Sequence, residues 1–295
     1  MKKIILSTLL VFNSLLLAKS VVAVSIAPQE IFVKKIANDK VDVVLMVERG
    51  SSPHSYEPKS SQMIALSKAD IYFSIGVEFE HAWLDKFKSQ NPHLKFIDIT
   101  HGVNKIDMAK HNHHDEDEHE EEHGHHEHHD EHKHDGDDPH TWTSPKNVQI
   151  MAKNIYKALS ESDPKNKSFY KKNLESFLNE INDTDKTIKS LLKDTKPKSK
   201  FMVFHPSWGY FAKEYNLVQI AVEVEGKSPK PKEMIKIIKE AKEENIKVIF
   251  TQPEFSDKSA QIISKEAGVK VIKVSPLNPK WSQNLINMAK AIANR

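Results

Sequence analysis

Short runs of β-branched residues alternate with helical stretches along most of this 295-residue chain, and this alternation restricts the fold more than any other feature. Strands that alternate with helices indicate βαβ units on parallel sheets. In the first half, we expect strands at Val21–Ala27, Val41–Val47, Asp70–Ile75 and Lys95–Ile99, and helices at Gln29–Ala37, Ser60–Ser67 and Glu78–Ser89. In the second half, we expect strands at Lys200–Phe204, Val218–Val222, Val248–Thr251 and Val269–Val274, and helices at Pro231–Glu244, Asp257–Ala267 and Trp281–Ala293. We therefore predict an α/β protein with two βα lobes.

A long amphipathic stretch separates the two halves. It begins at Asp163-Pro164, where an N-cap acceptor precedes a proline at the first helical position, and it ends before Pro197. Apolar residues recur in it at intervals of three, four and seven, which predicts one helix of about 29 residues and about 43 Å. Such a helix would cross both lobes, and the alternative is a surface helix of one lobe. The chain then divides into an N-terminal lobe (21–146), a linker region with the long connecting helix (147–197) and a C-terminal lobe (198–295).

Residues 1–20 have the pattern of a secretory signal peptide. Lys2 and Lys3 precede an apolar run, Ile4–Leu17, that is short for a membrane span. Ala18-Lys19-Ser20 places small residues where a signal peptidase reads them, so we expect cleavage after Ser20 and export to the periplasm. The alternative is an uncleaved anchor. The chain has no cysteine, which argues against disulfides, thiolate metal sites and a lipid-modified cysteine.

Residues 111–138 consist almost entirely of histidine, aspartate and glutamate. They offer no apolar residue to a core, so we predict a mobile loop within the N-terminal lobe. Imidazole suits zinc, copper and nickel, but ligands at variable spacing cannot impose one geometry, so the loop should bind several ions weakly. The alternatives are a solvating spacer or an unselective metal buffer. Its histidines are His111, His113, His114, His119, His123, His125, His126, His128, His129, His132 and His134. The net charge of the whole chain is only +2, and nothing in it suggests nucleic acid.

Three histidines outside the loop are candidate metal ligands because of their surroundings. His54 lies in SSPHSYEP, His140 in DDPHTW and His205 in FHPSWGYF. A proline flanks each histidine and stiffens its backbone, which favours a preorganised site. His54 and His205 also follow expected strands, at the edge where open α/β sheets bind ligands. Each histidine taken alone is as well explained as a structural or surface residue.

The same segments resemble the ABC-transporter solute-binding proteins for zinc and manganese, especially the zinc-uptake (ZnuA-like) branch. The resemblance covers essentially the whole chain after residue 20. It rests on PHSYEP, DPHTW and HPSWGYFAKEY in this order, followed by TQPEFSDKSAQIISKEAGVKVIKVSPL. It implies two βα lobes with one metal ion in the cleft between them, and a cognate ABC permease in the inner membrane as partner. The ligands that it implies are His54, His140 and His205.

The ligand set departs from parts of the family pattern. Manganese-type relatives have a carboxylate where this chain has His205, and an aspartate where it has Ser275. Some zinc relatives have an acidic residue where this chain has Pro53. Three imidazoles with an open fourth position remain, for water or for a carboxylate or histidine of the loop. Neutral imidazoles favour Zn²⁺ over manganese, which prefers oxygen ligands.

Five further residues are expected near the metal site because of their positions in the sequence. Glu254 follows an expected strand and matches a family glutamate, so we expect it to orient a ligand histidine, or else to be an ordinary charge at a helix N-terminus. Four aromatic residues should wall the cleft or, alternatively, pack in the core: Tyr56, Trp142, Trp208 and Tyr210.

Taken together, these features predict a monomeric zinc receptor without enzymatic activity. One alternative is a zinc buffer or chaperone that acts through the histidine-rich loop, and another is a receptor for manganese or another divalent metal. A hydrolytic zinc enzyme is a third alternative, which no HExxH motif supports.

Overall fold

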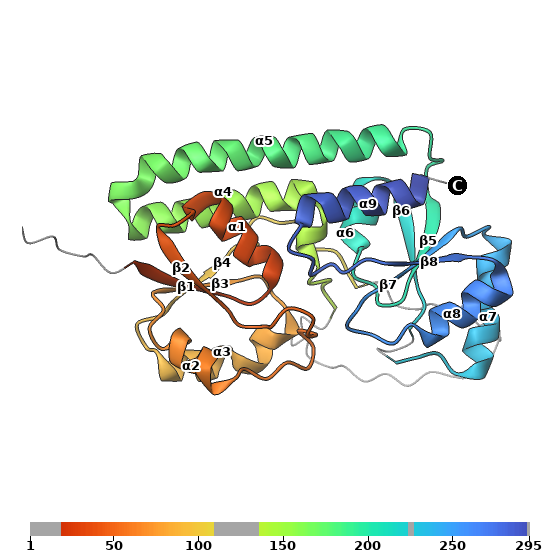
Figure 1. The fold of residues 1–295 in the computed structure, drawn as a ribbon, viewed down its shortest axis with the longest axis horizontal. Helices are drawn as coiled ribbons and strands as arrows, with labels where there is room; N and C mark the ends of the chain where they lie inside the picture. The colour runs from red at the N-terminus through yellow and green to blue at the C-terminus, as the bar shows by residue number, and fades with distance from the viewer. Residues whose placement is uncertain (1–18, 109–135, 224–226, 294–295) are drawn as a thin grey trace, which may run out of the picture.

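Two parallel sheets form the framework of the molecule, as the alternation of strands and helices predicted (Figure 1). The computed structural model describes residues 19–108, 136–223 and 227–293. The N-terminal sheet has the strand order β2-β1-β3-β4 and the C-terminal sheet β6-β5-β7-β8, so the two lobes share one topology. The strands are β1 (Ser20–Val24), β2 (Val41–Leu45), β3 (Ile71–Ser74), β4 (Lys95–Asp98), β5 (Ser199–Val203), β6 (Leu217–Ala221), β7 (Val248–Thr251) and β8 (Lys270–Lys273). Because neighbouring strands are parallel, their carboxyl ends lie at one edge of each sheet.

Helices cover both faces of the sheets. Figure 1 shows the N-terminal sheet between α1 and α4 on one side and α2 and α3 on the other. The helices are α1 (Ala27–Ala37), α2 (Ser60–Leu66), α3 (Glu78–Gln90), α4 (Pro145–Ser162), α5 (Lys167–Leu192), α6 (Gly209–Glu214), α7 (Pro231–Glu243), α8 (Lys258–Ala267) and α9 (Trp281–Ala293). Two 3₁₀ turns, η1 (Thr141–Thr143) and η2 (Pro164–Asn166), precede α4 and α5. The sequence prediction gave no bounds for α4 and omitted α6, which is only six residues long.

The first strand is shorter than predicted because α1 begins earlier than expected. The Gln29 side-chain oxygen accepts the backbone N–H groups of Ser25 (2.9 Å) and Ile26 (3.0 Å). These bonds satisfy donors at the helix N-terminus, and Pro28 suits the first turn. Ala27, which we expected at the end of the strand, is therefore the first residue of the helix.

The helix α5 crosses both lobes (Figure 1). It packs against α1 of the N-terminal lobe and α9 of the C-terminal lobe, so the predicted connecting helix is confirmed. Its 26 residues correspond to about 39 Å. It is shorter than predicted because Pro164–Asn166 form a 3₁₀ turn, which the Asp163 carboxylate holds by accepting bonds from Asn166 (2.6 Å) and Tyr170 (2.8 Å).

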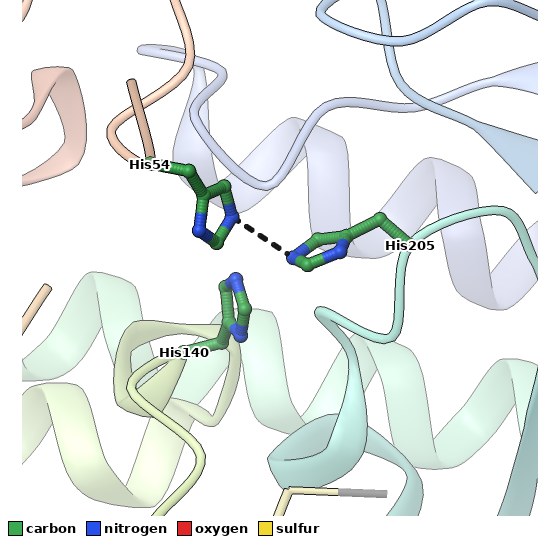
Figure 2. A group of neighbouring side chains, drawn as sticks. All are labelled: His54, His140 and His205. Atoms are coloured by element: carbon green, nitrogen blue, oxygen red, sulfur yellow. Dashed lines mark hydrogen bonds between the residues drawn. The ribbon is translucent and has the colours of Figure 1, made fainter. Parts of the chain in front are cut away.

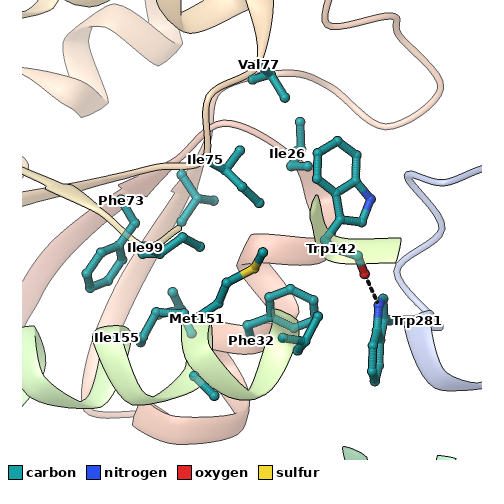
Figure 3. Close-up of a cluster of buried hydrophobic side chains, with 14 of the residues drawn as sticks. Ile26, Phe32, Phe73, Ile75, Val77, Ile99, Trp142, Met151, Ile155 and Trp281 are labelled. Carbon is teal, nitrogen blue, oxygen red and sulfur yellow. Dashed lines mark hydrogen bonds between the residues drawn. The ribbon is translucent and has the colours of Figure 1, made fainter. Parts of the chain in front are cut away.

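Two tryptophans join the lobes next to the strand ends (Figure 3). The Trp142 indole N–H donates to the Pro276 carbonyl of the C-terminal lobe at 2.8 Å, and the Trp281 indole N–H donates to the Trp142 carbonyl at 2.8 Å. Trp281 also meets Phe32 of α1 edge-on, with ring centroids 5.7 Å apart. These side chains are buried in one apolar core that spans both lobes. A shared core with buried hydrogen bonds restricts hinge motion between the lobes.

Two sequence predictions lie wholly or mainly outside the described residues. The signal-peptide prediction covers residues 1–20, of which only Lys19 and Ser20 are described, and Ser20 already belongs to β1. The histidine-rich stretch lies outside them up to residue 135. Its last three residues are ordered, because Met108 N–H donates to the Gly136 carbonyl (2.6 Å) and Asp138 N–H to the Ile106 carbonyl (2.8 Å). None of the described helices combines the length and the hydropathy that a bilayer-spanning helix requires.

Candidate metal centre

A small pocket lies between the lobes, at the carboxyl ends of the strands. Its volume is about 20 Å³, only slightly more than one water-sized particle needs. Three loops bring His54, His140 and His205 into its lining, and Figure 2 shows their rings converging on one point. The other lining residues are Ser52, Pro53, Val77, Glu78, Trp142, Gln252, Glu254, Phe255, Pro276 and Leu277.

The spacing of the three imidazoles suits one small metal ion. One ring nitrogen from each histidine lies within 4.8 Å of the other two. The Nε2 atoms of His54 and His205 are 3.2 Å apart. Two nitrogens bound to zinc at about 2.0–2.1 Å in a tetrahedron stand about 3.3 Å apart. The geometry therefore needs little rearrangement to accept a tetrahedral ion. Among residues 19–108, 136–223 and 227–293, no other such group of histidine and carboxylate ligands occurs.

His54 is held by the loop between β2 and α2. Gln62 organises this loop, because its side-chain amide donates to the carbonyls of Leu45 and Met46, both at 2.9 Å, while its oxygen accepts from Tyr56. The His54 Nδ1 atom lies 3.2 Å from Glu78 Oε1, at the start of α3. The hydrogen bond to Glu78 raises the pKa of His54, although partial burial opposes this. Burial acts to raise the pKa of Glu78, but the hydrogen bond and charge of His54 prevail and lower it to about 2.

His140 is buried and is held by a carboxylate two residues before it. Asp138 Oδ1 accepts both the backbone N–H of His140 (2.8 Å) and its Nδ1–H (2.8 Å). Tyr210 of α6 steadies this segment from the other lobe. Its hydroxyl donates to the Asp138 carbonyl at 2.9 Å and accepts from Ile106 N–H at 3.3 Å. With Nδ1 engaged, the Nε2 atom of His140 is left for the pocket.

His205 follows the end of β5 and is clamped at both its backbone and its ring. The Gln252 side chain donates to the His205 carbonyl (2.8 Å) and accepts its N–H (3.3 Å). The ring Nδ1 lies 2.7 Å from Glu223 Oε1, two residues beyond β6. Burial lowers the pKa of His205 despite the hydrogen bond to Glu223, and the neutral ring is the form that binds metal.

Aromatic rings wall the pocket, but only one of them was expected there. Trp142 lies against His140, with ring centroids 5.3 Å apart. Phe255, which the sequence analysis passed over, stacks on His205 with centroids 5.0 Å apart and planes inclined by 25°. Of the other residues expected to wall the cleft or pack in the core, Tyr56 packs on Phe79, whereas Trp208 and Tyr210 are buried in the apolar core. Trp208 packs edge-on against Phe211 of its own segment, which its place at the start of α6 dictates.

We expected Glu254 either to orient a candidate ligand histidine or to be an ordinary charge at a helix N-terminus. Glu254 lines the pocket, but its Oε1 accepts a hydrogen bond from Ser275 at 2.9 Å. The carboxylates in contact with the three candidate ligand histidines are Glu78, Asp138 and Glu223. Of these three carboxylates, only Asp138 could have been predicted from the sequence. It lies two residues before His140, a spacing at which an aspartate side chain can accept a hydrogen bond within a turn. Glu78 and Glu223 become neighbours of the histidines only through the sheet topology.

Comparisons with known proteins agree with this geometry. Residues 22–295 match the family described as "Zinc-uptake complex component A periplasmic", ZnuA. The chain is 33% identical to the high-affinity zinc uptake system protein ZnuA of Bacillus subtilis (strain 168) over 248 residues, which cover 82% of this chain and 74% of that protein. A crystal structure of ZnuA superimposes with a TM-score of 0.81 at 39% identity, covering 94% of this chain and 99% of the other. A ZnuA deletion mutant with zinc bound gives the same TM-score and identity, covering 94% and 98%. The chain therefore belongs to the ZnuA family of zinc-uptake complex components, which are binding proteins and not enzymes.

Proposed function

We propose that this protein is a periplasmic receptor that captures Zn²⁺ with high affinity and delivers it to an ABC-type permease. The observation that carries the proposal is the convergence of three imidazoles from three separate loops on a pocket large enough for one ion. The family match and the likeness to a zinc-bound ZnuA structure also support a function in zinc uptake.

The donor set supports zinc as the cargo. Three neutral imidazoles with one further position make a common zinc environment, whereas manganese prefers oxygen ligands. At the position where manganese-type relatives carry an aspartate, this chain has Ser275, whose hydroxyl donates to Glu254. The remaining coordination position is left to water, to Glu254 after a change of rotamer, or to a residue of the loop.

The chain would work as a soluble monomer after export. A cleavable signal peptide at residues 1–20 would release it into the periplasm, and the absence of cysteine is consistent with no lipid anchor. The partner would be the cognate permease of the inner membrane, since the family consists of components of uptake complexes.

The histidine-rich loop would raise the local zinc concentration near the pocket and bind further ions weakly. Met108 and Gly136, the residues that flank 109–135, are hydrogen-bonded to each other, so a short glycine linker can replace residues 109–135 without disturbing Asp138. We expect this deletion to preserve tight binding of one ion while reducing zinc uptake at low zinc. Unchanged uptake would contradict the proposed role of the loop.

Calorimetry of the mature protein with Zn²⁺ tests the proposal. The test variant changes His54, His140 and His205 to alanine, and the matched control changes His81, His93 and His101, which are exposed and lie away from the pocket. We expect the tight one-ion phase to disappear only from the test variant, with weak binding by the loop left in both. Tight binding that survives in the test variant would instead favour a zinc buffer that acts through the loop.

A further inference from the structure

We infer that Asp138 and Glu223 are positioning residues that hold two of the ligand imidazoles in the metal-binding tautomer, and that Gly209 provides the space Asp138 needs. The inference rests on the receptor function proposed above. It concerns residues that contact no metal themselves and act through His140 and His205.

Hydrogen bonds from both rings select the tautomer. His140 Nδ1 lies 2.8 Å from Asp138 Oδ1, and His205 Nδ1 lies 2.7 Å from Glu223 Oε1. A carboxylate accepts but does not donate, so each ring must carry its proton on Nδ1. The lone pair then lies on Nε2, which in both rings is the nitrogen left for the pocket.

The second oxygen of each carboxylate gives an independent reason to link these residues to a cation. Asp138 Oδ2 and Glu223 Oε2 are buried and have no hydrogen-bond partner. Over the described ranges 19–108, 136–223 and 227–293, the ion pairs of these two carboxylates are with His140 and His205 and not with lysine or arginine. Burying such charge without a counter-ion is unfavourable. A divalent cation between the two histidines would offset it.

A glycine at position 209 leaves room for the Asp138 carboxylate, and the backbone conformation there does not itself require glycine. Its φ is not in the positive region, so any residue fits the backbone there. A Cβ atom at this position would stand 2.5 Å from Asp138 Oδ2 and 3.3 Å from Ile106 Cδ1. Any larger side chain must therefore push the Asp138 carboxylate, and with it the His140 ring. Gly136, in contrast, has open space where its Cβ would lie, and it supplies a matched control.

The first experiment measures zinc affinity by competition between the mature protein and a chromophoric zinc chelator. It compares the wild type with variants in which a carboxylate is replaced by the amide of the same shape. Asp138→Asn and Glu223→Gln should each weaken zinc binding by about 10–100-fold. Glu78→Gln makes the same chemical change at an ion pair whose carboxylate side chain is 45% exposed. Water screens that pair, so its loss should be smaller.

Two further readouts separate positioning from a general structural role. Urea unfolding of the metal-free Asp138→Asn and Glu223→Gln proteins measures the cost of each change to the fold, so that affinities are compared only for variants that are fully folded in the assay. In ¹⁵N NMR of the metal-free wild type, His140 should carry its proton on Nδ1, and the Nε2-protonated form should appear in Asp138→Asn. Reduced stability with unchanged affinity and tautomer would overturn the inference.

Gly209→Ala tests the packing step. We expect it to weaken zinc binding in the same direction as Asp138→Asn, while Gly136→Ala leaves affinity unchanged. The double variant Asp138→Asn/Gly209→Ala should bind no more weakly than Asp138→Asn alone, because both changes act on one contact. Fully additive losses would contradict this link.

Failure of the inference is distinguishable from failure of the proposed function. If the triple histidine variant loses tight zinc binding while Asp138→Asn and Glu223→Gln keep wild-type affinity, the receptor function stands and the positioning role is wrong. If the triple variant keeps tight binding, the receptor site itself is misplaced.

Discussion

Glu80 of α3 is a buried carboxyl group, 2% exposed, in the interior of the N-terminal lobe. It accepts hydrogen bonds from the backbone N–H groups of Ile75 (2.9 Å) and Gly76 (2.8 Å), and from the Ser25 hydroxyl. Burial outweighs these bonds and raises its pKa from 4.5 to about 7. The folded protein therefore holds the Glu80 proton more tightly than the unfolded chain does.

The sign and size of the effect on stability follow from this difference in pKa. Because the folded-state pKa is the higher one, the contribution to stability is complete below pH 4.5. It declines as the pH rises toward 7 and is lost above that. At about 1.4 kcal/mol for each pH unit between the two pKa values, the loss is about 3 kcal/mol. Glu80→Gln resembles the protonated acid: its amide can donate to Ser25, and its oxygen can accept from the backbone.

Urea unfolding of the metal-free protein at pH 5, 6, 7 and 8 measures the effect. We expect the free energy of unfolding of Glu80→Gln to exceed that of the wild type by less than about 1 kcal/mol at pH 5 and by about 3 kcal/mol at pH 8. Glu161→Gln, a change at an exposed position on α4, should follow the wild type at every pH. A constant difference between Glu80→Gln and the wild type from pH 5 to 8 would refute the reasoning.

Two further predictions concern the metal site and the backbone. Zinc affinity should fall as the pH drops below about 6, because the ligating imidazoles must be neutral. Competition with a zinc chelator at pH 5, 6 and 7 measures this change. An affinity that does not change with pH would argue against imidazole ligands. Lys198 has a φ of 58°, in the left-handed region. Lys198→Gly should therefore stabilise the protein by about 0.5–1 kcal/mol in thermal unfolding, while Lys193→Gly, where φ is −53°, should give no gain.

The candidate ligand residues could be proposed from the sequence because their signals are local. Proline next to a histidine and a histidine just after a strand are patterns within a few residues, and the structure brings His54, His140 and His205 together. The expectation for Glu254 was also local, since it follows β7, but position after a strand does not determine the partner of a side chain. Here Ser275, 21 residues away, takes its hydrogen bond.

The sequence by itself determined the two-lobed α/β architecture, the connecting helix and the three candidate ligands, because periodicity and turn chemistry act over short distances. Only the tertiary structure decided which carboxylate meets which imidazole, that Phe255 and not Tyr56 walls the pocket, and why residue 209 is glycine. Glu223 reaches His205 because β5 and β6 are parallel neighbours, and Gly209 meets Asp138 because α6 of one lobe packs against a loop of the other. Such contacts depend on strand order and on how the lobes are joined, and no short stretch of sequence specifies either.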